Sequence, residues 1–359
     1  MDRALLVTVD MRKREDWTAE ERSVELAELT ASAGAGVIKN IVVKRHAPCP
    51  SHFIGSGKAE EVAAICAEEK INLVIFNNDL TGTQQKNLEE TIGTRVIDRT
   101  QLILDIFARR ARSNEGKLQV ELAQLMYMMP RLTDKGTELS RLGGGIGTRG
   151  PGEQKLEVDR RRIRDRIARL KKDLSGLGSR RGMMRKRRSK FRIPSVAIVG
   201  YTNTGKSTLL NALTGSSVAV RDKLFATLDP TIRKLTMPDK REILFIDTVG
   251  FLKELPHHLI EAFQATLEEA AESDLLVHLI DASHSKAKEQ AEAVYKVLGG
   301  IGALNKPVMT VLNKIDKVTP DEAERLKGLL GAEVSISALS REGLGGLVEK
   351  IAAAVPVLT

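Results

Sequence analysis

The stretch that decides the fold reads Gly200-Tyr201-Thr202-Asn203-Thr204-Gly205-Lys206-Ser207-Thr208. It follows an apolar run over 196–199 and opens an amphipathic segment over 208–213, so its context is strand, turn and helix. The spacing G-x-x-x-x-G-K-S in that context is typical of a loop whose backbone N–H groups surround a phosphate. A plain glycine turn before a helix is the alternative, but it leaves the Lys-Ser pair unexplained. We therefore expect Lys206 to reach the β- and γ-phosphates of a nucleotide and Ser207 to ligate Mg²⁺.

A second motif follows a predicted strand over 243–246 and reads Asp247-Thr248-Val249-Gly250. This pattern is weak alone, but it is specific at a strand end downstream of a phosphate loop. We expect Asp247 to hold Mg²⁺ through a water molecule and the Gly250 N–H to contact the γ-phosphate.

A third motif follows a predicted strand over 308–312 and reads Asn313-Lys314-Ile315-Asp316. The Asp316 carboxylate can accept hydrogen bonds from guanine N1–H and the 2-amino group, and adenine lacks both donors, so Asp316 selects guanine. Lys314 can lie over the base, and Asn313 can tie this loop to the phosphate loop. The backbone of Ser337-Ala338-Leu339 can meet guanine O6. Alone, the third motif is compatible with a surface turn. The three motifs in this order along the chain, each after a predicted strand, predict a site for GTP and its product GDP.

Between the first two motifs the chain reads Phe225-Ala226-Thr227-Leu228-Asp229-Pro230-Thr231. A threonine in a loop here can complete the Mg²⁺ shell and sense the γ-phosphate, and both Thr227 and Thr231 qualify from the residues alone. Many GTPases orient the attacking water with a glutamine after the second motif, but this chain has Phe251 there. No catalytic base is therefore identified, and we predict slow intrinsic hydrolysis that a partner stimulates.

The positive charge is concentrated in one segment. The chain has 359 residues and a net charge of +9, yet residues 155–192 carry 17 Lys and Arg against 4 Asp and Glu. That local charge of +13 leaves the rest of the chain at −4. A solvated helix face is one explanation, but we favour binding to RNA phosphates because so few acidic residues accompany the cations. Aromatic residues make up only 3%, which argues against base stacking as a major binding mode.

Composition also excludes several classes of protein. Two cysteines cannot form a disulfide framework, and no Cys/His spacing suggests zinc. No apolar run approaches the length of a membrane span. A cytoplasmic, monomeric protein is the expectation.

Hydrophobic periodicity divides this α/β chain into three predicted domains. Residues 1–112 alternate predicted strands and helices, which indicates a small parallel-sheet α/β domain. Residues 113–192 carry apolar residues at the spacing of packed helices around a glycine-rich stretch over 141–152, which predicts an antiparallel helical hairpin with a glycine-rich tip. Residues 193–359 contain the nucleotide motifs and form the predicted GTPase domain. The candidate RNA contacts are Arg141 and Arg149 at the tip and Arg160, Arg161 and Arg164 on the second helix.

A short glycine motif in the first domain, Gly55-Ser56-Gly57-Lys58, departs from the phosphate-loop pattern. His52 stands where that pattern requires its first glycine, and Ala59 replaces the Ser/Thr. We expect a tight turn leading into a helix, with a second nucleotide site as the alternative.

The chain resembles the Obg–HflX branch of the TRAFAC GTPases at residues 200–203 and 225–231. It is similar to the HflX family specifically at three segments, which read Gln119-Val120-Glu121-Leu122-Ala123-Gln124-Leu125, Pro130-Arg131-Leu132 and Gly150-Pro151-Gly152-Glu153. The resemblance covers nearly the whole chain and implies Thr227 as the Mg²⁺-binding threonine. It also implies binding to the large ribosomal subunit and its rRNA, with the tip approaching the peptidyl-transferase region, and splitting or rescue of stalled ribosomes under stress.

Two other functions fit the same residues. One is an RNA-remodelling NTPase that uses the first domain as a second nucleotide site. The other is a non-catalytic, GTP-gated adaptor for another protein.

Overall fold

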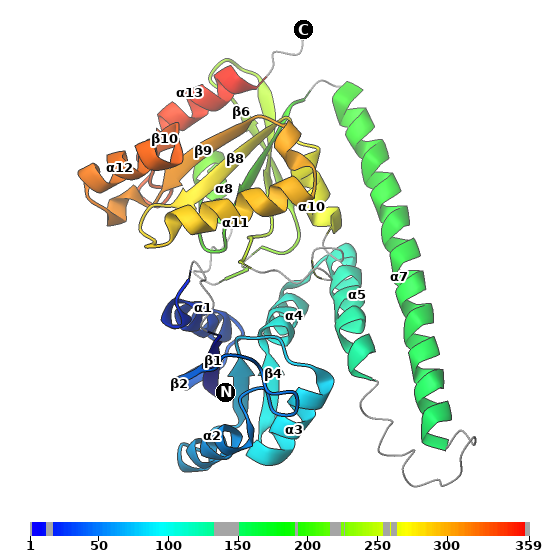
Figure 1. Ribbon diagram of the computed structural model, residues 1–359. Coiled ribbons are helices and arrows are strands. Elements are labelled where there is room, and N and C mark those ends of the chain that lie inside the picture. Colours follow the sequence, from blue (N-terminus) through cyan, green and yellow to red (C-terminus); the bar gives the residue numbers. More distant parts are fainter. Residues whose placement is uncertain are drawn as a thin grey trace. The chain divides into compact units, whose positions relative to one another are not determined.

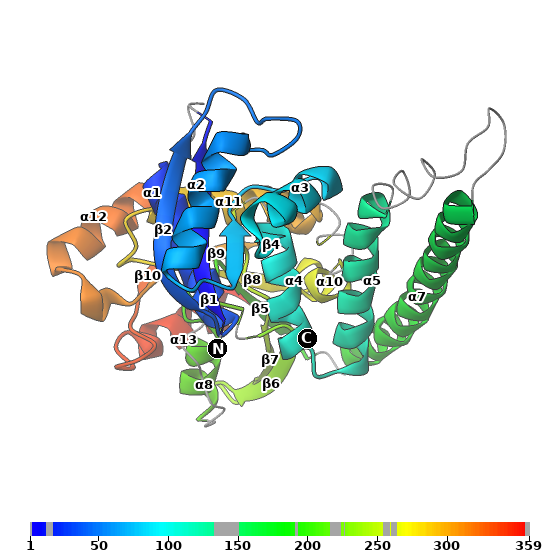
Figure 2. The ribbon, with the colours of Figure 1, turned by 90° about the horizontal axis from the view of Figure 1, so that it is seen from below.

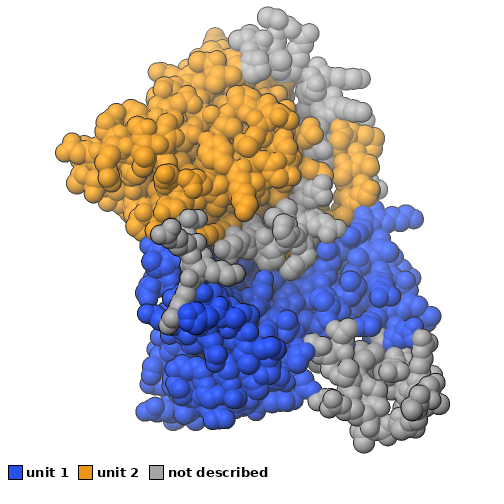
Figure 3. Space-filling model, viewed as in Figure 1, with its two compact units in different colours: residues 1–109, 118–173 blue, residues 110–117, 174–359 orange. Residues whose placement is uncertain are grey.

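The computed structural model describes residues 2–11, 17–132, 151–190, 193–215, 224–225, 227–253, 259 and 264–355. The chain divides into two compact units, residues 1–109 with 118–173 and residues 110–117 with 174–359 (Figure 3). Helices α5 and α7 each contribute to both units. Among the described residues, no helix has both the length and the apolar content that crossing a bilayer requires.

The N-terminal part of the first unit is a four-stranded parallel sheet in the order β2-β1-β3-β4 (Figure 1). Its strands are β1 (Arg3–Asp10), β2 (Gly36–Lys44), β3 (Leu73–Phe76) and β4 (Arg95–Asp98). The helices that alternate with them are α1 (Ala19–Ser32), α2 (Ser56–Glu68), α3 (Gly82–Ile92) and α4 (Arg99–Arg110). Helix α2 begins directly after Gly55, whose φ is 86°, so the predicted turn into a helix is confirmed.

The predicted pair of helices consists of α5 (Asn114–Arg131) and the 40-residue α7 (Pro151–Lys190). Within the first unit, α5 and the first part of α7 lie side by side (Figures 1 and 2). Arg166 of α7 donates two hydrogen bonds of 2.7 Å to the Glu121 carboxylate of α5. Leu122 and Leu170 are buried, as the seam spacing predicts.

The second unit contains a six-stranded sheet in the order β10-β9-β8-β5-β7-β6, with β6 antiparallel to β7 and the other pairs parallel. Its strands are β5 (Ser195–Gly200), β6 (Thr231–Thr236), β7 (Glu242–Asp247), β8 (Leu275–Asp281), β9 (Val308–Asn313) and β10 (Val334–Ser335). Its helices are α8 (Lys206–Thr214), α10 (Gln264–Ala271), α11 (Ala287–Gly300), α12 (Pro320–Leu330) and α13 (Leu344–Ala354), with short 3₁₀ turns η1 (Ala303–Asn305) and η2 (Ile315–Lys317). The α/β class predicted from the alternating pattern is confirmed.

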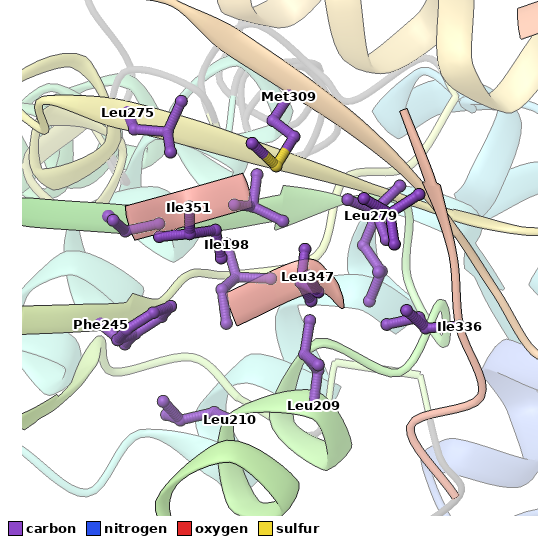
Figure 4. Close-up of a cluster of buried hydrophobic side chains, with 14 of the residues drawn as sticks. Ile198, Leu209, Leu210, Phe245, Leu275, Leu279, Met309, Ile336, Leu347 and Ile351 are labelled. Atoms are coloured by element: carbon purple, nitrogen blue, oxygen red, sulfur yellow. The ribbon is translucent and has the colours of Figure 1, made fainter. Parts of the chain in front are cut away.

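One apolar core holds α8 and α13 against this sheet (Figure 4). Leu209 of α8, Ile198 of β5, Phe245 of β7 and Leu347 of α13 are all fully buried in it. Because β5, β7, β9 and β10 run parallel, their carboxyl ends meet at one edge of the sheet. The motifs that start at Gly200, Asp247 and Asn313 each begin at one of these ends, so a rigid core fixes three of the loops that form the site.

Candidate functional site

A cavity of about 320 Å³ lies at the carboxyl edge of the six-stranded sheet. It brings together most of the predicted nucleotide-binding residues: Thr202, Asn203, Gly205, Lys206, Ser207, Thr208, Phe225, Thr227, Thr248, Gly250, Asn313, Lys314, Asp316, Ala338 and Leu339. Lys317 also lines it and was not predicted. The other predicted residues lie outside its lining: Gly200, Tyr201, Thr204, Leu228, Asp229, Asp247, Val249, Ile315 and Ser337. Ala226 lies outside the described residues.

The phosphate loop needs glycine at 205. Gly205 has φ 94°, which L side chains rarely adopt, and a Cβ atom there would collide with Nδ2 of Asn313. Directly after it, the buried Lys206 donates hydrogen bonds to the carbonyl oxygens of Gly200 at 3.2 Å and Tyr201 at 2.7 Å. Burial lowers the pKa of Lys206 to about 8, against the opposing effect of the Asp247 carboxylate. A phosphate anion would stabilise the protonated amine, so this lysine is poised to bind one.

Three oxygen-bearing side chains converge beside the loop. Ser207 and Thr227 each donate a hydrogen bond to Oδ2 of Asp247, at 2.6 and 2.8 Å, and their hydroxyl oxygens lie 2.8 Å apart. Adjacent oxygen ligands of an octahedral Mg²⁺ ion are about 2.9 Å apart, so the Ser207–Thr227 pair fits this cation. Asp247 is 1% exposed, and its Oδ1 has no hydrogen-bond partner among the described residues. Burial raises the pKa of Asp247, which is the cost of holding a carboxylate where a cation would stabilise it.

Asn313 joins the phosphate loop to the base-recognition loops. Its Nδ2 donates to the carbonyl oxygen of Thr204 at 2.7 Å, the contact that the sequence predicts. Its Oδ1 accepts the N–H of Ala338 at 2.9 Å, a second bond that sequence reasoning missed. Asn313 is 2% exposed, so both bonds are shielded from water. One side chain thus fixes the relative positions of three loops.

Lys314 adopts a left-handed conformation with φ 63°. Its Nζ forms a 2.6 Å ion pair with Asp281, the last residue of β8. Asp281 was not predicted, although it ends its strand next to Asn313 at the end of β9. Its carboxylate holds the Lys314 side chain at the edge of the cavity, while the exposed Asp316 lines the cavity as expected.

The segment after Asp247 is tied to the phosphate loop. Phe251 pairs with the loop backbone: its carbonyl accepts the Thr202 N–H at 2.8 Å, and its N–H donates to Gly200 at 3.1 Å. The Tyr201 hydroxyl accepts the N–H of Lys253 at 2.8 Å. The Phe251 side chain is fully buried and does not line the cavity. Phe251 therefore contributes to the packing of the core. No catalytic base is identified among the described residues.

The predicted RNA contacts are only partly described. Arg161 and Arg164 of α7 are exposed and Arg160 is half-buried, whereas Arg141 and Arg149 lie outside the described residues. Arg166 on the same helix is committed to Glu121, and that hydrogen bond lowers the pKa of the Glu121 carboxyl. Exposed arginines on α7 therefore differ from Arg166 in being able to meet a phosphate without breaking a contact between helices.

Three protein-family models match the chain. They are described as GTP-binding GTPase N-terminal over residues 20–108, GTP-binding GTPase Middle Region over 110–188, and 50S ribosome-binding GTPase over 195–314. The sequence is 52% identical over 352 residues to the GTPase HflX of Caldanaerobacter subterraneus subsp. tengcongensis, covering 98% of this chain and 80% of that one. It is 46% identical over 315 residues to the GTPase HflX of Escherichia coli, covering 88% and 73%.

A solved structure is similar over nearly the full length. It is a GTP-binding protein from the hyperthermophilic archaeon Sulfolobus solfataricus in complex with GDP. The TM-score is 0.52 at 27% identity, and the match covers 99% of this chain and 98% of that one. The resemblance therefore extends beyond the nucleotide motifs to the whole described architecture.

Proposed function

The chain belongs to the HflX family of GTPases, and on that premise we propose that it binds the large ribosomal subunit and its rRNA and hydrolyses GTP to GDP, slowly alone and faster on the ribosome. We propose further that this activity splits or rescues stalled ribosomes under stress. The chain would act as a cytoplasmic monomer with an α/β domain over 1–112, a helical hairpin over 113–192 and a GTPase domain over 193–359. The family model described as a 50S ribosome-binding GTPase supports the choice of partner.

The observation that carries the nucleotide part of the proposal is the convergence of the motif loops on one cavity. Lys206 and the Gly250 N–H would bind the β- and γ-phosphates, and Asp316 would accept the two guanine donors that adenine lacks. Ser207 and Thr227 would hold Mg²⁺, with Asp247 supporting both hydroxyls. When bound, Mg²⁺ neutralises charge that develops on the phosphate oxygens.

Partner stimulation follows from what the site lacks. The position directly after Gly250, where many GTPases carry a glutamine that orients the attacking water, holds Phe251 in this chain. The Phe251 side chain is buried and has no hydrogen-bond donor or acceptor, so it cannot take that role. Ordering of the loop around Thr227 by a ribosomal partner would supply the missing positioning.

Sedimentation with ribosomal subunits tests the proposal. We expect the chain to pellet with the large subunit more with a non-hydrolysable GTP analogue than with GDP, and binding to weaken steeply as salt rises. Replacing Arg161 and Arg164 by Gln should reduce the slope of log K against log salt by about 1.5. Arg325→Gln removes one exposed charge from α12 and serves as the control for a general effect of lost charge, against the single replacements of Arg161 and Arg164. Equal pelleting with both nucleotides, or GTP hydrolysis that ribosomes do not accelerate, would contradict the proposal.

One observation favours the second candidate, an RNA-remodelling NTPase. A hollow of about 530 Å³ in the first unit is lined by Lys44, Arg45, His46 and Lys58, at the end of β2 and the start of α2. Such a basic hollow can attract an anion. ATP hydrolysis that survives Lys206→Ala would support this candidate, and its loss with GTP hydrolysis would exclude it.

A further inference from the structure

Asp229 does not face the cavity; its carboxylate meets the start of α5. Its Oδ2 accepts the backbone N–H groups of Arg112 and Ser113, each at 2.9 Å. Its Oδ1 accepts the Ser113 hydroxyl. All of these residues belong to the second compact unit, although 116 positions separate Ser113 from Asp229 along the chain.

The start of a helix is where such a carboxylate stabilises most. Arg112 and Ser113 directly precede Asn114, the first residue of α5, and a negative charge at this end of a helix interacts favourably with the helix dipole. The Ser113 hydroxyl oxygen accepts the Gly116 N–H at 2.8 Å, so Ser113 caps α5 and Asp229 in turn holds Ser113. A Cβ atom at Gly116 would collide with Oδ1 of Asp229, so glycine at this position leaves room for the carboxylate.

The same short segment reaches the predicted metal ligands. Thr227, two residues before Asp229, contacts Ser207 and Asp247 through its hydroxyl. Leu228 between them is 2% exposed and anchors the segment in the core. A ligand that fixes Thr227 therefore also restricts where the Asp229 carboxylate can lie.

We propose that Asp229 is a positioning residue that couples the nucleotide site to the first turn of α5, so that GTP with Mg²⁺ orders the start of the helical hairpin. This inference rests on the proposed function and names its route of regulation. The coupling is reciprocal: a partner that holds α5 in this position raises the affinity for GTP over GDP by the same factor. Helix α5 carries the effect onward because it continues without interruption from Asn114 to Arg131.

Gly116→Ala tests the coupling from the side of the helix, in the full-length protein. Alanine favours a helix over glycine, so the change stabilises an ordinary helix position, but here its methyl group displaces the carboxylate. We expect the ratio of affinities for a non-hydrolysable GTP analogue and GDP to fall roughly tenfold. Gly176→Ala in α7 is the matched control, because a Cβ atom there meets nothing within 4 Å.

Amide hydrogen exchange of Arg112 and Ser113 gives a readout that a merely structural role would not move. In the unaltered chain these amides should exchange more slowly with the GTP analogue than with GDP. The difference should vanish in Asp229→Ala and persist in part in Asp229→Asn, which keeps an acceptor oxygen. In the Asp229→Ala background, Gly116→Ala should raise the melting temperature, because the carboxylate oxygen that the methyl group would meet is then absent.

The proposed function and the proposed coupling through Asp229 can be refuted separately. A chain that binds no guanine nucleotide refutes the proposed function, and the coupling with it. A chain that binds and hydrolyses GTP, yet keeps its affinity ratio in Gly116→Ala or exchanges both amides equally with either nucleotide, refutes the coupling alone.

Discussion

Replacing Asn313 by Ala gives the sharpest test of how the nucleotide site is built. The substitution removes two hydrogen bonds, one to the carbonyl of Thr204 and one from the N–H of Ala338. Both partners belong to loops that line the cavity or adjoin it, and Asn313 is 2% exposed. Leaving a buried polar group without its partner costs about 1–3 kcal/mol, so two such groups cost roughly 3 kcal/mol after partial rescue by water.

That free energy is the loss we expect in GDP binding, because the loops must be brought back into register when the nucleotide binds. A loss of about 3 kcal/mol is a reduction in affinity of about 150-fold. Isothermal titration calorimetry with GDP measures it, and circular dichroism checks that the fold is retained. Asn305→Ala, at an exposed position of the same unit, is the control. If Asn313→Ala binds GDP within threefold of the unaltered chain, the loops are positioned by their own backbones and the reasoning is wrong.

Three further predictions address charge in and around the cores. Lys206→Ala should weaken GDP binding by about 10–100-fold, because a charge-assisted hydrogen bond to phosphate is lost. Lys317→Ala, at the rim of the cavity, should change the affinity for GDP little. Fluorescence titration with GDP measures both affinities. Burial lowers the pKa of His278 to about 4 from 6.5, so the imidazole takes up its proton at a higher pH in the unfolded chain than in the folded one. The free energy of unfolding should therefore drop by about 3 kcal/mol between pH 6.5 and 4. Chemical denaturation across this range measures the drop, and the His278→Phe variant should lack this contribution to it. Arg131→Leu should destabilise the first unit by about 3–5 kcal/mol, because it leaves the fully buried Asp98 without its 2.9 Å ion-pair partner; adding Asp98→Asn should restore part of the melting temperature.

The nucleotide motifs could be predicted because their chemistry lies in local spacing. A phosphate loop needs glycine where the backbone is left-handed and a Lys-Ser pair at the helix start, and Gly205, Lys206 and Ser207 meet both needs within three residues. The parallel sheet then brings distant motifs to one edge, because each follows a strand. Asn313 could be assigned to the phosphate loop for the same reason.

The contacts that sequence reasoning missed all depend on which segments meet in space. Nothing near Asp281 in the sequence indicates that Lys314 is its partner, and nothing near Asp229 points to the start of α5. The predicted seam of α5 is also incomplete: Gln119 and Val120 are buried on another side of the helix, off the spacing that predicts Leu122. A helix that packs on two sides has no single apolar stripe, so periodicity reveals only part of its buried surface.

The hydrogen bonds of Asn313 and those of Asp229 both connect the nucleotide site to other segments, but they differ in burial, and this difference suits their proposed roles. Asn313 is almost fully buried, so its bonds do not exchange with water, and the base-binding side should keep one geometry in every nucleotide state. Asp229 is half-buried, so water can replace its carboxylate as the acceptor of the Arg112 and Ser113 N–H groups when the carboxylate moves away. Solvent screening limits its contribution to about 1–2 kcal/mol, which corresponds to a factor of about 5–30 in an equilibrium. A coupling of that size is enough to favour the ordered start of α5 when one nucleotide is bound. It is also small enough for loss of the γ-phosphate to reverse this preference. Hydrogen bonds as buried as those of Asn313 would instead hold the hairpin in one state throughout the GTPase cycle.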